Sequence, residues 1–154
     1  VNICNALRQI AADETVEVVF PVHLNPRVQG PVYELLADIP NVTLLPPLGY
    51  PAFTWLMIQS YLIITDSGGI QEEAPGLGKP VLVMREVTER PEAVDAGVVK
   101  LVGADTDRIV EEAKKLIRDS EAYASMSQAA NPYGDGKSAL RIADILLNDH
   151  SFVR

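Results

Sequence analysis

Five short apolar runs, each rich in β-branched residues and each followed by a helical pattern, constrain the fold of this chain more than any other feature. They cover residues 16–20, 42–45, 61–65, 81–84 and 98–102. Runs that are apolar at nearly every position are typical of parallel strands, because such strands are covered on both faces. Candidate helices lie at 27–38, 51–59, 69–77, 91–97 and 106–120. The alternation predicts an α/β fold with a doubly wound, Rossmann-like parallel sheet.

Three helical patterns add detail to this expectation. The helix at 106–120 carries an apolar stripe on one face, formed by Ile109, Val110, Ala113, Leu116 and Ile117. A first helix is already running at residues 2–3, as in a chain cut from something longer. A last helix follows Gly136 and is apolar around much of its circumference, so it packs either within its own core or against a second body as well.

Length, charge and composition exclude several classes of protein. A chain of 154 residues predicts one domain, 1–154, with a sizeable core. One cysteine, Cys4, excludes an internal disulfide and a cysteine-cluster metal site, and two histidines, His23 and His150, are too few for a histidine-rich one. A net charge of −8 argues against nucleic acid and anionic membranes as partners. No apolar run could span a bilayer and no secretory pattern is present, so we expect a cytoplasmic protein.

The turn Ser67-Gly68-Gly69 is the strongest indication of a ligand. It joins the apolar run 61–65 to the helix at 69–77. Such a junction directs free backbone N–H groups and the positive end of a helix dipole at one point, where a phosphate can bind. Glycine turns between a strand and a helix are also common without any ligand, so a purely structural role is the alternative. Glu73, one helical turn after Gly69, could accept the hydroxyl groups of a ribose, or simply place a favourable charge near the helix start.

Other loops follow the carboxyl ends of the expected strands and should lie on the same side of the sheet as this turn. They offer His23, a titratable imidazole, Phe53, a flat ring for a base, and Arg90, a fixed cation for phosphate. Each has an ordinary alternative: a hydrogen-bonded loop histidine, a core phenylalanine and a surface arginine. The convergence of the loops favours a phosphorylated ligand.

Five motifs, in this order, closely resemble the C-terminal half of the non-hydrolysing UDP-N-acetylglucosamine 2-epimerases. They are PVHLNP at 21–26, TDSGGIQEEAP at 65–75, GKPVLVMR at 78–85, TERPEA at 88–93 and NPYGDG at 131–136. The similarity covers essentially the whole chain. It implies the C-terminal half of a GT-B fold, two Rossmann-like domains with the active site in the cleft between them, and a last helix that crosses back to the N-terminal domain.

The resemblance also implies residue roles. Ser67, Gly68 and Gly69 would receive the diphosphate and Glu73 the ribose. The backbone at Leu48 and the ring of Phe53 would receive the uracil. Arg90 would contact phosphate or the closing cleft, and His23 would lie near the cleft, where bacterial members bind a second, activating UDP-GlcNAc. No metal and no cofactor are implied, and full-length members are commonly homodimers.

In the family reaction, UDP is eliminated from UDP-GlcNAc to leave a glycal and then adds back, giving UDP-ManNAc. The acidic catalytic residues, a Gly-Thr-Arg-Pro-Glu motif and a Thr-Gly-His-Arg-Arg-Glu motif precede the part of the family that this chain resembles, and these residues contain none of them. We therefore expect no confidently assigned catalytic residue here and no turnover by the chain alone. The alternatives are a GT-B glycosyltransferase domain, a hydrolysing epimerase and a non-enzymatic UDP-sugar-binding module.

Overall fold

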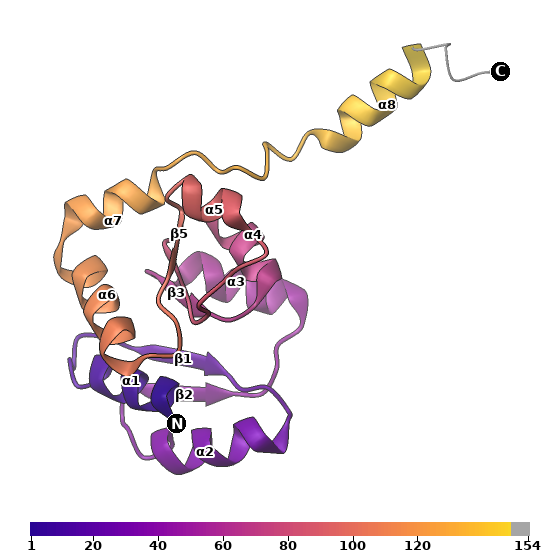
Figure 1. The fold of residues 1–154 in the computed structure, drawn as a ribbon. Helices are drawn as coiled ribbons and strands as arrows, with labels where there is room; N and C mark the ends of the chain where they lie inside the picture. Colours follow the sequence, from indigo (N-terminus) through magenta and orange to yellow (C-terminus); the bar gives the residue numbers. More distant parts are fainter. Residues whose placement is uncertain (149–154) are drawn as a thin grey trace.

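All five strands run parallel, in two hydrogen-bonded sheets (Figure 1). The structure, a computed structural model, describes residues 1–148; His150 lies outside the described residues. The smaller sheet pairs β1 with β2, from Val18 opposite Val42 to Pro21 opposite Leu45. The larger sheet has the order β3-β4-β5. The strands are β1 (Val18–Pro21), β2 (Val42–Leu45), β3 (Ile63–Thr65), β4 (Val81–Val83) and β5 (Val99–Leu101).

Helices connect successive strands and continue to the C-terminal end of the described chain. They are α1 (Asn2–Ile10), α2 (Pro26–Leu36), α3 (Tyr50–Gln59), α4 (Gly68–Gly76), α5 (Pro91–Asp95), α6 (Thr106–Arg118), α7 (Ser120–Ser127) and α8 (Ser138–Asn148). The expected parallel α/β class is confirmed, and every expected strand and helix is present with ends shifted by a few residues. Among the described residues, no helix has both the length and the apolar character needed to cross a membrane.

The division into two sheets differs from the single sheet that the sequence predicts. An apolar run indicates that a strand is covered on both faces, but it does not specify which strand lies beside it. Between β1 and β3 the structure has a cavity lined by residues of both strands in place of a backbone ladder. Ile64 of β3 nevertheless packs against apolar clusters on both sides of this division.

Helix α1 holds the two sheets together because its buried side chains belong to two different clusters. Ala6 and Ile10 pack with Leu82 of β4 and with the apolar stripe of α6. Cys4, Leu7 and Ala11 pack with α2 and the smaller sheet. The expected stripe on α6 is confirmed: Ile109, Val110, Ala113 and Leu116 are buried and Ile117 packs against them.

The C-terminal region departs most from the expectations. Helix α6 ends at Arg118, two residues earlier than predicted, because the carboxylate of Asp119 caps the next helix by accepting hydrogen bonds from the backbone N–H groups of Glu121 and Ala122, both at 3.0 Å. Helix α7 was not predicted. Helix α8 extends away from the rest of the chain (Figure 1), and its large apolar side chains, Leu140, Ile142, Ile145, Leu146 and Leu147, are 52–75% exposed. Of the two alternatives, packing within its own core is therefore wrong for α8.

Candidate functional site

The candidate site begins where β3 ends and α4 begins. Ser67 has extended backbone angles and occupies the N-cap position, and its backbone N–H donates to the hydroxyl of Thr65 at 3.0 Å. The Ser67 side chain makes no capping hydrogen bond. The amide groups of Gly68, Gly69 and Ile70 lie in the first turn, where a helix offers no acceptor of its own. This turn can therefore donate hydrogen bonds to an anion, as the sequence predicts.

Gly68 is approached closely by an acidic side chain from another loop. A Cβ atom at Gly68 would lie 2.5 Å from Oε1 of Glu89, so this carboxylate would have to move to make room for a larger residue. Oε2 of Glu89 accepts a hydrogen bond from Nη1 of Arg85 at 2.9 Å. The backbone N–H of Glu89 itself, followed by the charges of Arg85 and Arg90, lowers the pKa of this carboxyl below its usual range. A negative charge thus already lies beside the positive end of α4.

Arg90 lies beside the same helix, and its guanidinium is paired. Its Nε donates to Oε1 of Glu72 on α4, and its Nη1 donates to the carbonyl oxygen of Glu89 at 3.2 Å. The hydrogen bond to Glu72 raises the pKa of Arg90 above its usual value. Arg90 is the N-cap residue of α5, directly before Pro91. The structure thus brings Arg90 to α4, as predicted, with its side chain held by a carboxylate.

A chain of hydrogen bonds through one buried glutamine connects the α4 turn to the Arg90 loop, and the sequence reasoning missed it. Gln71 is fully buried, and its Nε2 donates to the carbonyl oxygen of Ser67 at 3.3 Å. Its Oε1 accepts from the Thr88 hydroxyl at 2.5 Å, and this hydroxyl accepts from the backbone N–H of Arg90 at 3.0 Å. The spacing from Gln71 to the buried residues Ala74 and Pro75 could have placed this glutamine on the inner face of α4.

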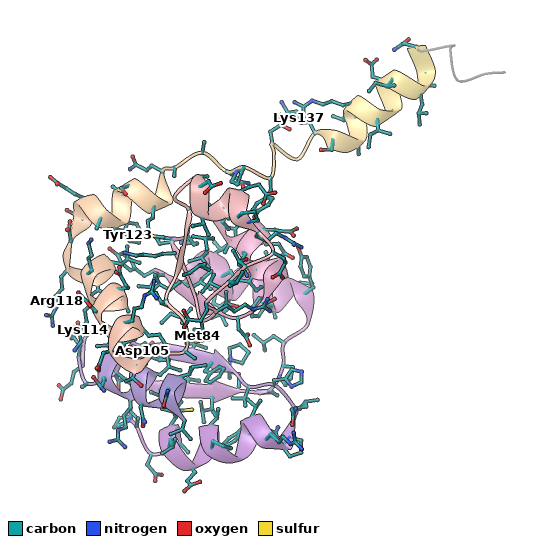
Figure 2. All side chains as sticks on the ribbon, in the orientation of Figure 1. Met84, Asp105, Lys114, Arg118, Tyr123 and Lys137 are labelled. Carbon is teal, nitrogen blue, oxygen red and sulfur yellow. The ribbon has the colours of Figure 1, made fainter. Side chains whose placement is uncertain are left out.

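His23 and Phe53 line a separate part of the site, the cavity of about 670 Å³ between β1 and β3. His23 is exposed, and its Nδ1 accepts a hydrogen bond from the backbone N–H of Asn25 at 3.1 Å. Phe53 is half-buried and also packs against the core below α4. Met84, labelled in Figure 2, follows β4 and contributes to the same wall. Asp66 and Ile70 line the cavity too, and they flank Ser67–Gly69 in the chain.

Leu48 and Glu73 have fewer contacts with the other predicted site residues. Leu48 is half-buried in the loop between β2 and α3, and Glu73 is exposed on α4, one turn after Gly69. Among the described residues, no hydrogen bond or ion pair links either side chain to the other predicted site residues. Their proposed contacts to a nucleoside stay predictions.

Tyr133, from the NPYGDG motif, lies beside the pair of Arg90 and Glu72. Its ring packs against the apolar cluster that contains Ala93 of α5. Burial, followed by the charges of Glu92 and Glu72, raises the pKa of Tyr133, whereas the charge of Arg90 lowers it. This part of the motif therefore lies close enough to the charged pair to feel its field.

Comparison with known proteins gives one consistent answer. The family model described as UDP-N-acetylglucosamine 2-epimerase matches residues 1–147. The chain is 59% identical over 147 residues to the UDP-N-acetylglucosamine 2-epimerase of Campylobacter jejuni, covering 95% of this chain and 38% of that protein. It is 56% identical over 149 residues to the enzyme of Escherichia coli K12, covering 96% of this chain and 40% of that protein.

Solved structures agree with the sequence comparisons. The crystal structure of UDP-GlcNAc 2-epimerase from Neisseria meningitidis bound to UDP-GlcNAc has a TM-score of 0.89 and 49% identity, covering 95% of this chain and 40% of that chain. The Methanocaldococcus jannaschii enzyme in complex with UDP-GlcNAc and UDP has a TM-score of 0.78 and 31% identity, covering 95% and 40%. The chain thus spans about two fifths of the length of the relatives that it matches. By its sequence and its fold, the chain belongs to the UDP-N-acetylglucosamine 2-epimerase family.

Proposed function

We propose that residues 1–154 form the UDP-binding domain of a cytoplasmic UDP-N-acetylglucosamine 2-epimerase, and that catalysis needs a further, N-terminal domain. The observation that carries this proposal is the glycine turn at the start of α4, with Arg90 attached to the same helix. A helix N-terminus and an arginine together provide the positive potential that a diphosphate needs. The Neisseria meningitidis relative, which is 49% identical, was crystallised with UDP-GlcNAc bound.

The proposed ligand contacts follow the chain. The backbone of Ser67–Gly69 binds the diphosphate, and Glu73, on the same helix, binds the ribose hydroxyls. Phe53 stacks on the uracil, which also contacts the backbone at Leu48; the half-buried position of Phe53 supports this role because one face can pack while the other stays accessible.

Two charged groups have to rearrange when the diphosphate binds. The carboxylate of Glu89 lies beside Gly68, where a phosphate would be repelled by it. The guanidinium of Arg90 is paired with Glu72. Both ion pairs are partly exposed, with side-chain exposures of 39% and 49% for Arg85 and Glu89 and of 32% and 40% for Arg90 and Glu72. Exposed pairs are weak, so the diphosphate can displace Glu89 and draw Arg90 away from Glu72.

The role of this domain in the reaction is to hold UDP through both half-reactions. When the bond between carbon 1 of the sugar and UDP breaks, negative charge develops on the diphosphate, and the α4 amides and Arg90 stabilise it. Because UDP stays bound, it is positioned to add back to the glycal after a proton has been returned to carbon 2 on the other face. The acid and base that move this proton belong to the N-terminal domain, and the reaction uses no metal or redox cofactor. The full-length protein acts as a homodimer.

Calorimetric titration with UDP tests the proposal, with and without EDTA. The chain is expected to bind UDP equally well in both, because the α4 amides and Arg90 supply the positive charge. Binding that disappears on chelation, or no binding at all, would contradict the proposed site. An activity test of the full-length protein with UDP-GlcNAc and no acceptor separates an epimerase from a glycosyltransferase, and accumulation of free UDP would indicate a hydrolysing enzyme.

A UDP-sugar-binding module without activity is the second candidate for these residues alone, and the coverage of 38–40% of the relatives favours it. The cavity that His23 and Phe53 share gives such a module a second surface near the diphosphate turn. We propose that His23 contacts an activating UDP-GlcNAc there.

A further inference from the structure

We propose that Gln71 and Thr88 are positioning residues that hold the Arg90 loop against the diphosphate turn. This inference rests on the proposed function, because it assigns them a purpose at the proposed diphosphate site. The two side chains form a continuous chain of hydrogen bonds from the carbonyl oxygen of Ser67 to the backbone N–H of Arg90.

The burial of Gln71 makes this chain significant. Its side chain is fully buried, on the face of α4 that also buries Ala74 and Pro75. A buried amide without hydrogen-bond partners is costly, whereas an apolar side chain at this position would not be. Gln71 uses its amide oxygen for Thr88 and its amide nitrogen for Ser67, so both ends of the group are paired.

The attachment through Thr88 acts on the backbone of the loop and not on the Arg90 side chain. The guanidinium is held by Glu72, but that attachment would be lost if the guanidinium turned to a phosphate. The bond from the Arg90 N–H to the Thr88 hydroxyl does not depend on where the guanidinium points. It therefore keeps Arg90 beside α4 in the bound state, when the position of the arginine matters most. Holding the Arg90 loop and the Ser67 turn in place before the ligand binds reduces the conformational entropy that is lost on binding.

The substitution Thr88→Val tests this inference, because valine keeps the shape of threonine and removes the hydroxyl. Affinity for UDP and for pyrophosphate should fall about three- to tenfold, as for the loss of a single neutral hydrogen bond. Affinity for uridine should not change, because the nucleoside lacks the diphosphate. Thr88→Ser keeps the hydroxyl, so its affinity for each of the three ligands should lie within about twofold of that of the unaltered chain.

The double variant Gln71→Met, Thr88→Val separates positioning from folding. Replacing both partners of a hydrogen bond by apolar groups of similar shape is nearly neutral for stability. The melting temperature of the double variant should therefore equal that of the unaltered chain, even where Thr88→Val alone lowers it. Its affinity for UDP should stay as low as that of Thr88→Val. Restored affinity in the double variant, or equal UDP affinity in Thr88→Val and the unaltered chain, would overturn the inference alone. If the unaltered chain bound no UDP, the proposed function would fail and this inference with it.

Discussion

Replacing Glu73 with alanine should weaken the binding of UDP and leave the binding of pyrophosphate unchanged. Glu73 is exposed on α4, one turn beyond Gly69, and among the described residues its side chain forms no hydrogen bond or ion pair. Its removal therefore costs the fold little, within about 0.5 kcal/mol. A hydrogen bond to a charged group contributes about 1.5–3 kcal/mol, so the dissociation constant for UDP should rise roughly 10- to 150-fold.

Calorimetric titrations of UDP and pyrophosphate into both chains measure this difference. Glu111→Ala is a matched control, because Glu111 is an exposed glutamate on α6, away from the turn. It should change neither affinity. An equal loss for UDP and pyrophosphate in Glu73→Ala would mean that Glu73 acts on the helix or on its charge, and the assignment to ribose would be abandoned.

Three other predictions concern the same molecule. Glu89→Gln should bind UDP more tightly than the unaltered chain, because it removes a negative charge beside Gly68. The control Glu86→Gln alters a carboxylate beside Gly103 and should bind UDP as the unaltered chain does. Titration of both variants with UDP tests this difference. Leu82→Ala should lower the free energy of unfolding by about 3–5 kcal/mol in urea denaturation, because Leu82 is fully buried in the cluster that it forms with α1 and α6; a loss below 1 kcal/mol would contradict this core. The chain incubated with UDP-GlcNAc in deuterated water should give no UDP-ManNAc and no deuterium at carbon 2 by NMR, and exchange above a control without protein would place a catalytic base among these residues.

Sequence reasoning predicted well the elements whose signal lies within a few neighbouring residues. The α6 stripe repeats every three or four residues, and the structure buries it. The turn at Ser67 was predicted because glycines follow an apolar run directly, and the start of α4 at Gly68 confirms it. In both cases the information is local, so it can be read without knowing which elements are neighbours.

What the sequence could not provide depends on contacts between distant segments. Nothing in the runs at 16–20 and 61–65 indicates that a cavity lies between β1 and β3. Helix α7 is short, and its contacts are with distant segments. Ala122 and Met126 pack against the core cluster of α1, β4 and α6. Tyr123 stacks on Tyr61 with ring centroids 4.2 Å apart, and its hydroxyl donates to the Tyr61 carbonyl oxygen at 3.1 Å. The partner of Gln71 is Thr88, 17 residues away, and no periodicity connects the two.

The charged side chains around the Ser67 turn are paired with one another, and these pairs bear on the proposed diphosphate site. Glu89 pairs with Arg85 and Glu72 pairs with Arg90. The carboxylate of Glu89 also lies beside Gly68, at the positive end of α4. Both carboxylates are partly exposed, so they regain water when they are displaced and the exchange costs little. The connection through Gln71 and Thr88 would not take part in this exchange, because the Gln71 side chain is fully buried and is hydrogen-bonded to the half-buried Thr88. Under the proposed function, a ligand would replace the exposed ion pairs and move the Arg90 guanidinium, whereas the connection through Gln71 and Thr88 would hold the Arg90 backbone. A perturbation of that connection should therefore alter where the Arg90 backbone lies.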